Sequence, residues 1–289
     1  MRPIDSTTAI YGIIGYPVSH TFSPAMHNAA FAKVGLNCAY LAFCVRPDRL
    51  KSSILGMRGL GIAGVNVTVP HKEMVIPLLD ELSREAKLVG AVNTIVVEGD
   101  RLIGHNTDGR GFVLSLKRDL RIEPKKKSVF IIGAGGAAKA ISFQLAIEGA
   151  RYIYLTDIAK DKAQRLVTLL NKNMPSCHAK LIPNEAREME RTVADADILI
   201  NATPCGMKKH DPLLLNPKSL HSKLVVCDLI YNPPLTSLLK AARSRKLKIM
   251  NGLGMLLYQG AMSFYLWTKK HPPVDIMRRA LLQEMRRSR

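Results

Sequence analysis

A glycine-rich turn near the middle of the chain carries the clearest chemical signal. The residues Gly133-Ala134-Gly135-Gly136-Ala137 follow an apolar run, residues 129–132, and open a segment of helical character. Glycines permit a tight turn and let a pyrophosphate approach the backbone, and the N-terminus of the following helix attracts the phosphates. The sequence therefore predicts a dinucleotide-binding site at this turn.

The residue Asp157 ends the next expected strand, where an acidic side chain can accept hydrogen bonds from the adenosine ribose of NAD. Its charge would repel the additional phosphate of NADP, so we expect NAD to be favoured over NADP. Two observations keep other interpretations open. Lys160, Lys162 and Arg165 lie close enough in sequence to turn toward a phosphate, and Asp157 could serve only to cap the next helix.

A second polar segment, Asn201-Ala202-Thr203, follows the apolar residues 198–200. Open α/β sheets bind ligands at the carboxyl ends of their strands. We assign this segment to the nicotinamide half of the cofactor, with an ordinary turn as the alternative.

Lys72 is the candidate for proton transfer in the first third of the chain. It lies at the start of a helix and follows a strand, residues 65–69, in which Asn66 and Thr68 share one face. A single lysine is usually exposed to solvent, so Lys72 needs a partner before it becomes a catalytic candidate.

A predicted β-hairpin gathers further polar side chains. Residues 91–97 and 101–105 are strand-like and are joined by a turn at Gly99. This hairpin pairs residue 93 with about residue 105, which brings Asn93 close to Asn106, Thr107 and Asp108. Polar groups that are distant in sequence therefore converge at its open end.

The elements that position these residues predict an α/β protein of two domains with a cleft between them. From residue 129 onward, apolar runs alternate with helices, which indicates a parallel sheet with crossover helices. We expect an N-terminal α/β substrate-binding domain, residues 1–107 and 252–289, in which two C-terminal helices pack back on the first part. Residues 108–251 would form a Rossmann-type, doubly wound dinucleotide-binding domain.

The composition is ordinary for a soluble globular protein. Hydrophobic residues make up 47% and charged residues 22% of 289 positions, and the most apolar stretch, residues 128–150, is interrupted by glycines, Lys139 and Glu148. The start of the chain has no secretion-signal pattern, and the five cysteines form no CxxC pair. We therefore expect a cytoplasmic protein without membrane contact, as a monomer or homodimer.

The net charge of +19 raises nucleic acid as a partner. The basic residues are scattered, however, and no aromatic residues interleave them, so we expect no nucleic acid and instead some steering of an anionic substrate and cofactor. Four histidines, His20, His27, His71 and His105, lack the spacing of zinc ligands, so no metal is expected.

Taken together, eight segments resemble the shikimate dehydrogenase family in order and spacing over nearly the whole chain. They are residues 20–24, residues 66–72, Gly90-Ala91-Val92-Asn93-Thr94, Asn106-Thr107-Asp108-Gly109, residues 133–137, Asn201-Ala202-Thr203, Tyr231-Asn232-Pro233 and Gln259-Gly260-Ala261.

The resemblance implies reversible, nicotinamide-dependent reduction of 3-dehydroshikimate to shikimate, with Lys72 and Asp108 as the proton-handling pair. It also implies that the substrate is held by Thr21, Ser23, Thr68, Asn93, Tyr231 and Gln259, and that Leu229 and Gly252 touch the nicotinamide.

Two departures from the family pattern leave alternatives. Thr21-x-Ser23 replaces the common Ser-x-Ser, and Asp157-Ile158-Ala159 replaces the Asn-Arg-Thr of NADP-using members. Both are compatible with an NAD-dependent quinate/shikimate dehydrogenase. A member of another class, a metabolite-sensing or nucleic-acid-binding module without catalysis, would have no need of the Lys72–Asp108 pair.

Overall fold

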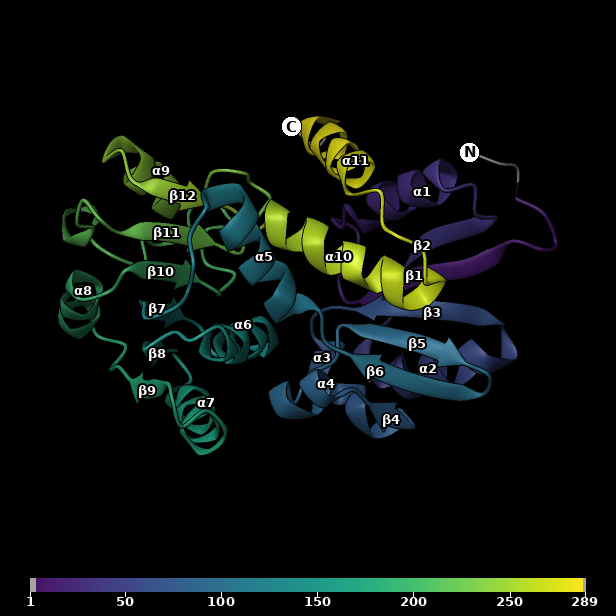
Figure 1. Ribbon diagram of the computed structural model, residues 1–289, viewed down its shortest axis with the longest axis horizontal. Helices are drawn as coiled ribbons and strands as arrows, with labels where there is room; N and C mark the ends of the chain where they lie inside the picture. The colour runs from purple at the N-terminus through teal and green to yellow at the C-terminus, as the bar shows by residue number, and fades with distance from the viewer. Residues whose placement is uncertain (1–3, 288–289) are drawn as a thin grey trace. The chain divides into compact units, whose positions relative to one another are not determined.

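The computed structural model describes residues 4–287, which divide into two compact units. One unit holds the chain up to Gly111 and from Leu256 onward, and the other holds Phe112–Met255. Each unit is built on its own six-stranded sheet flanked by helices (Figure 1). The predicted α/β class with two domains is confirmed. Along residues 4–287, every helix is too short or too polar to cross a membrane.

The first unit contains a mixed sheet with the strand order β2-β1-β3-β5-β6-β4. Strands β1, β2 and β3 run parallel, whereas β5 is antiparallel to both β3 and β6. Its strands are β1 (Ala9–Gly15), β2 (Cys38–Cys44), β3 (Ile62–Val67), β4 (Glu81–Leu82), β5 (Thr94–Glu98) and β6 (Arg101–His105). Its helices are α1 (Ser23–Lys33), α2 (Leu50–Gly59), α3 (His71–Met74) and α4 (Arg84–Val89), with the greater part of α10 (Leu253–Thr268) and all of α11 (Val274–Arg287).

The hairpin forms as the turn at Gly99 predicts. Thr94 pairs with His105 and Glu98 with Arg101, and the Asn93 N–H donates to the His105 carbonyl at 3.0 Å. Gly99 has a φ of +61°, which a glycine adopts without the steric cost of a Cβ atom. The residue order of this turn therefore sets the register that brings Asn93 to the strand end beside Asn106.

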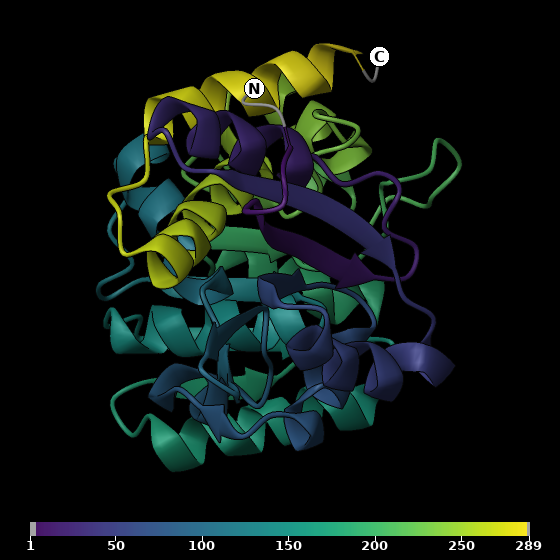
Figure 2. The same ribbon diagram turned by 90° about the vertical axis from the view of Figure 1, so that its right-hand side faces the viewer.

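The structure differs from expectation at β3. The alternation of apolar and polar residues predicts a half-exposed strand, but Asn66 is only 4% exposed. The reason is that β3 lies inside the sheet, between β1 and β5, and α10 supplies Ser263 as a partner for the Asn66 amide. The last helix, α11, packs beside α1, as Figure 2 shows with both helices along the upper side.

The second unit contains an all-parallel sheet with the order β12-β11-β10-β7-β8-β9. Counted within this unit, the order is 6-5-4-1-2-3, the doubly wound arrangement in which ligands bind where the order reverses, here between β7 and β10. The strands are β7 (Ser128–Ile132), β8 (Tyr152–Thr156), β9 (His178–Leu181), β10 (Ile198–Asn201), β11 (Val225–Asp228) and β12 (Lys248–Met250). The helices are the greater part of α5 (Asp108–Leu120), then α6 (Gly136–Ile147), α7 (Lys160–Asn173), α8 (Ala186–Ala194) and α9 (Ser237–Ser244).

An asparagine from an adjacent helix covers one edge strand in each sheet. At β2, the Asn28 side chain accepts from the Tyr40 N–H at 2.8 Å and donates to the Tyr40 carbonyl at 2.9 Å. At β9, Asn171 makes the same two bonds to Ala179, at 2.9 and 3.0 Å. An edge strand with unpaired backbone groups is a template for pairing with another chain. Each amide fills the place that a neighbouring strand would take.

We expect Asn28→Ala to lower the free energy of unfolding by about 1–3 kcal/mol, because the Tyr40 backbone groups lose both partners in a largely buried position. Urea unfolding followed by circular dichroism measures the change. Asn171 is exposed, so water can replace its amide, and Asn171→Ala should cost less. Unchanged unfolding of Asn28→Ala would show that Asn28 contributes nothing to the strand edge.

Candidate active site

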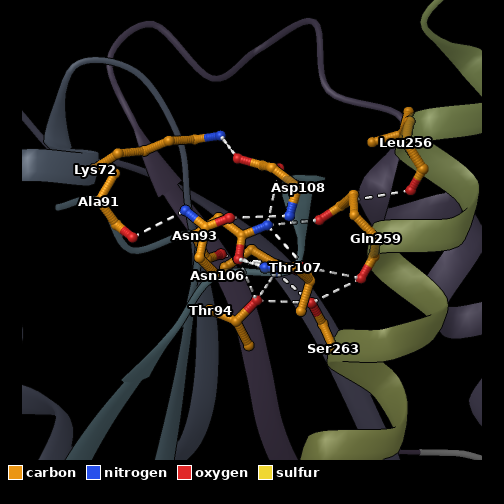
Figure 3. Close-up of polar contacts among 11 residues, drawn as sticks. Lys72, Ala91, Asn93, Thr94, Asn106, Thr107, Asp108, Leu256, Gln259 and Ser263 are labelled. Carbon is orange, nitrogen blue, oxygen red and sulfur yellow. Dashed lines mark hydrogen bonds and ion pairs between the residues drawn. The ribbon is translucent and has the colours of Figure 1, made fainter. Parts of the chain in front are cut away.

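Lys72 and Asp108 form an ion pair in the first unit (Figure 3). The Lys72 Nζ atom lies 2.5 Å from Asp108 Oδ2, and the two side chains are 17% and 5% exposed. Lys72 is the second residue of α3 and Asp108 is the first residue of α5. The pair is shielded from bulk water. Its charges therefore interact more strongly than they would at the protein surface. A carboxylate so placed can hold an ammonium group in position for proton transfer.

Asn93 fixes the carboxylate of this pair. The Thr107 backbone N–H can only donate, and it does so to Asn93 Oδ1 at 2.9 Å, so the amide nitrogen must face the opposite way. That nitrogen donates to Asp108 Oδ1 at 2.9 Å. Asn106 completes the strand end by accepting from the Asp108 N–H at 3.1 Å and donating to the Ala91 carbonyl at 2.9 Å. Each oxygen of the Asp108 carboxylate therefore has its own donor.

Helix α10 contributes Gln259 and Ser263 to the same network (Figure 3). Asn93 Nδ2 lies 3.2 Å from Gln259 Oε1, and the Gln259 carbonyl accepts from both Thr107 Oγ1 and Ser263 Oγ at 3.1 Å. Ser263 is not among the residues that the sequence predicts for the site. Its spacing of four residues from Gln259 places both on one helix face, which was an available signal.

Asn66 connects these residues to the core by hydrogen bonds. Its amide donates to Ser263 Oγ at 3.0 Å and to Thr94 Oγ1 at 3.1 Å, and its oxygen accepts from the Tyr40 hydroxyl at 2.7 Å. All of these groups are buried, so a lost partner would leave a neighbouring polar group unsatisfied. The network from Tyr40 to Lys72 is therefore continuous.

Three further residues expected at the substrate, Thr21, Ser23 and Thr68, carry hydroxyl groups. Thr21 Oγ1 donates to Ser23 Oγ at 3.2 Å, and Ser23 is the buried first residue of α1. Thr68 follows the end of β3, where its N–H donates to the Ile14 carbonyl at 2.9 Å. Within the part of the chain that the structure describes, no side-chain hydrogen bond joins these three residues to the Lys72–Asp108 pair.

In the second unit, two glycines of the turn have different surroundings. Gly133 has a φ of +110°, and a Cβ atom there would lie 2.9 Å from the Ala202 carbonyl oxygen. A Cβ atom on Gly135 would meet nothing within 4 Å, and the N-terminus of α6 has no side-chain cap. The backbone N–H groups of Gly135, Gly136 and Ala137 at this end can therefore serve an anionic group.

The strand ends beside the turn are joined by the buried carboxylate of Asp228. Its oxygens accept from Asn201 Nδ2, the Ile230 N–H and Thr236 Oγ1 at 3.1, 3.0 and 2.7 Å. Asn201 Oδ1 in turn accepts from the Thr203 N–H and hydroxyl. Asp228 is also absent from the residues predicted for the site, although it ends the strand next to Asn201.

Leu229 and Gly252, both expected at the nicotinamide, are brought together in this unit. A Cβ atom on Gly252 would lie 1.9 Å from the Leu229 carbonyl oxygen, so only glycine fits there. Tyr231 follows in the same loop, half-buried, and burial raises the pKa of its phenol. Among residues 4–287, no three His, Cys, Asp or Glu side chains are grouped to hold a metal ion.

Comparison with known proteins finds relatives over nearly the whole chain. Residues 13–95 match the shikimate dehydrogenase substrate binding domain, and residues 252–282 match the shikimate 5'-dehydrogenase C-terminal domain. The NADP(+) shikimate dehydrogenase of Methanopyrus kandleri is 46% identical over 98% of each chain. The chain belongs to the shikimate dehydrogenase family.

Two solved members of the family superpose closely. A shikimate dehydrogenase in complex with NADP+ has a TM-score of 0.89 and 40% identity over 98% of each chain. The enzyme of Listeria monocytogenes, in complex with shikimate and NAD, also has a TM-score of 0.89, with 39% identity over 97% of this chain and 99% of that chain. The predicted family membership is confirmed.

The prediction that NAD is favoured over NADP is wrong. Relatives at 42–46% identity are named as NADP(+) enzymes, and one of the solved structures holds NADP+. The prediction depended on an Asp157 carboxylate directed at the ribose. In the structure, Asp157 Oδ2 accepts from the Ala134 N–H at 2.7 Å and Oδ1 accepts from the Ala159 N–H at 2.8 Å, so both oxygens are engaged by the backbone.

The buried Asp228 makes stability depend on pH. Burial raises the pKa of its carboxyl group above the ordinary value of 3.8, while the hydrogen bonds from Thr236, Ile230 and Asn201 lower it by less. The folded state therefore binds the proton more tightly than the unfolded state. As the pH rises from the ordinary pKa to the raised pKa of this carboxyl group, the free energy of unfolding that the bound proton contributes is lost.

We expect Asp228→Asn to lose less stability than the wild type as pH rises through this interval, because the amide has no charge to bury. Unfolding free energies measured at a series of pH values from acidic to neutral give the difference between the two proteins. Asp195→Asn, at an exposed position in the same unit, is the matched control. Parallel pH profiles for wild type and Asp228→Asn would contradict a raised carboxyl pKa.

Proposed function

We propose that this chain catalyses the reversible reduction of 3-dehydroshikimate to shikimate with NADP(H). The observation that supports this most directly is the shielded Lys72–Asp108 pair with its carboxylate held by Asn93. The family supplies the substrate class, because the relatives are named shikimate dehydrogenases and one structure contains shikimate. In this proposal the first unit binds the substrate and the second binds the dinucleotide.

The pair suits the proton half of the reaction. The cofactor, when bound, supplies or accepts the hydride. As the carbonyl carbon is reduced, negative charge develops on the oxygen, which Lys72 as an ammonium group stabilises and protonates. Asp108 holds the ammonium in place and balances its charge in both directions of the reaction.

The remaining expected residues act in binding. In this proposal the substrate carboxylate and ring hydroxyls are held by Thr21, Ser23, Thr68, Asn93, Tyr231 and Gln259. Hydrogen-bonding side chains suit a polyol, because an analogue that lacks one hydroxyl would leave a buried polar group unpaired at a cost of about 1–3 kcal/mol. Leu229, Gly252, Ala202 and Thr203 are proposed to line the nicotinamide side. We further propose that the protein is cytoplasmic and acts in the biosynthesis of aromatic amino acids.

Lys72→Ala should lower kcat by roughly two to four orders of magnitude, because it removes the general acid, while KM for shikimate changes much less. Steady-state oxidation of shikimate with NADP+ measures both constants. Lys87→Ala, at an exposed position on α4, is the matched control and should leave them unchanged. Wild-type turnover by Lys72→Ala would remove Lys72 from the mechanism.

The substrate is tested by initial rates with shikimate and with quinate, each with saturating NADP+. We expect the larger kcat/KM for shikimate, and Thr21→Ser, which restores the smaller hydroxyl residue, should alter the ratio of the two. A higher kcat/KM for quinate would contradict the proposed substrate.

A further inference from the structure

Helix α3, which carries Lys72, is too short to be stable by itself. It has four residues, His71–Met74, which make about one turn. An isolated turn of helix has little stability in water, so its position depends on contacts with the rest of the unit. Lys72 nevertheless holds its Nζ atom 2.5 Å from Asp108 Oδ2 (Figure 3). The contacts that anchor α3 therefore decide where the ammonium group lies.

The His71 side chain is one such anchor. It is buried, and its Nε2 atom lies 2.6 Å from the Val45 carbonyl oxygen, directly after the end of β2. A carbonyl oxygen can only accept, so Nε2 carries a proton and donates it. The Val45 N–H donates in turn to the carbonyl of Gly15, the last residue of β1, at 3.0 Å. His71 thus joins α3 to the carboxyl ends of two neighbouring strands.

Backbone hydrogen bonds hold α3 on its other sides. The Val75 N–H donates to the His71 carbonyl at 2.9 Å, which closes the single turn. The Lys72 carbonyl accepts from the Val92 N–H at 2.8 Å, directly before Asn93, the residue that fixes the Asp108 carboxylate. The amide groups of Val75 and Val92 therefore report whether this turn is in place.

The second ring nitrogen of His71 indicates that the imidazole serves this bond and not packing alone. Nδ1 is buried and, within the described residues 4–287, has no hydrogen-bond partner. A buried polar atom without a partner lowers the stability of the folded state. An apolar side chain would avoid this loss, so what a histidine adds here is the bond to Val45.

We propose that His71 is a positioning residue for Lys72, and that it acts by donating from Nε2 to the Val45 carbonyl. The inference rests on the proposed function, because it assigns to His71 the alignment of the general acid. A misplacement of about 1 Å can lower a rate about a hundredfold, so loss of this anchor should appear in kcat. The residues proposed to hold the substrate are not on α3, so KM should change little.

The experiment compares three substitutions of His71 in the full chain. His71→Leu removes the donor, whereas His71→Gln keeps an amide nitrogen the same number of bonds from Cβ as Nε2. His71→Asn places its amide one bond too short, which makes it the matched polar control for the glutamine. His271→Leu, at an exposed position in the same unit, controls for the loss of an imidazole. Thermal unfolding shows which variants fold, and if the leucine variant does not, glutamine against asparagine carries the test.

We expect His71→Leu and His71→Asn to lower kcat for shikimate oxidation with NADP+ about ten- to hundredfold, while KM for shikimate stays within about threefold. His71→Gln should keep kcat within about threefold of the wild type. Hydrogen exchange at the Val75 and Val92 amides, measured by NMR without substrate, should be about tenfold faster or more in the leucine and asparagine variants only. His271→Leu should change none of these quantities.

A double-mutant cycle shows whether His71 acts through Lys72. In the Lys72→Ala protein, the further change His71→Leu should alter kcat by less than about twofold, because the group that His71 positions is gone. A general structural role of His71 would lower kcat again in this background.

Three results would overturn the inference. Wild-type kcat and wild-type exchange in His71→Leu would show that the turn is held without this bond. A glutamine variant as slow as the leucine variant would show that the bond to Val45 is not the cause. A further tenfold loss of kcat in the Lys72→Ala protein would show that His71 does not act through Lys72. The expected exchange pattern in a protein that does not turn over shikimate would contradict the proposed function alone.

Discussion

The orientation of one buried amide, that of Asn93, governs the polar side chains around Lys72. A backbone N–H can only donate a hydrogen bond, so the group that faces the Thr107 N–H must be the oxygen of the Asn93 amide. The nitrogen of the same amide then faces Asp108. The carboxylate is thereby aimed at Lys72. Because every member is buried, an unpaired group costs about 1–3 kcal/mol, and the arrangement has few alternatives.

The second unit also has a buried hydrogen bond between an asparagine amide and an aspartate carboxylate at its strand ends. Asn201 and Asp228 lie opposite one another on adjacent parallel strands, and their side chains fix the loops that follow. The donors to Asp228 are all neutral, in contrast with the ammonium beside Asp108. One carboxylate is therefore suited to ordering a loop, and the other to balancing a charge.

Hydrogen bonds to the backbone also decide which role a polar side chain has. Asp157 looks like a ribose ligand by position, but two N–H groups engage its oxygens and make it part of the turn. Asn28 and Asn171 look like ordinary surface asparagines, yet each bonds both backbone groups of an edge-strand residue. In each case the function of a side chain follows from the group beside it.

The sequence by itself determined the family, through the resemblance of eight segments to known members. It also determined the two-domain α/β class, the glycine turn and the hairpin, because these depend on local turn chemistry and on the period of apolar residues. The turn at Gly99 was enough to predict the hairpin, and with it the approach of Asn93 to Asp108, although the observed register, Thr94 opposite His105, differs by one residue from the predicted pairing of residue 93 with about residue 105. Only the tertiary structure decided that Asn66 is buried, that Ser263 and Asp228 join the polar networks, and that Asp157 is bonded to the Ala134 and Ala159 N–H groups. These facts depend on which strand lies inside a sheet and which backbone groups face a side chain, and contacts between distant segments leave no periodic signal in the chain.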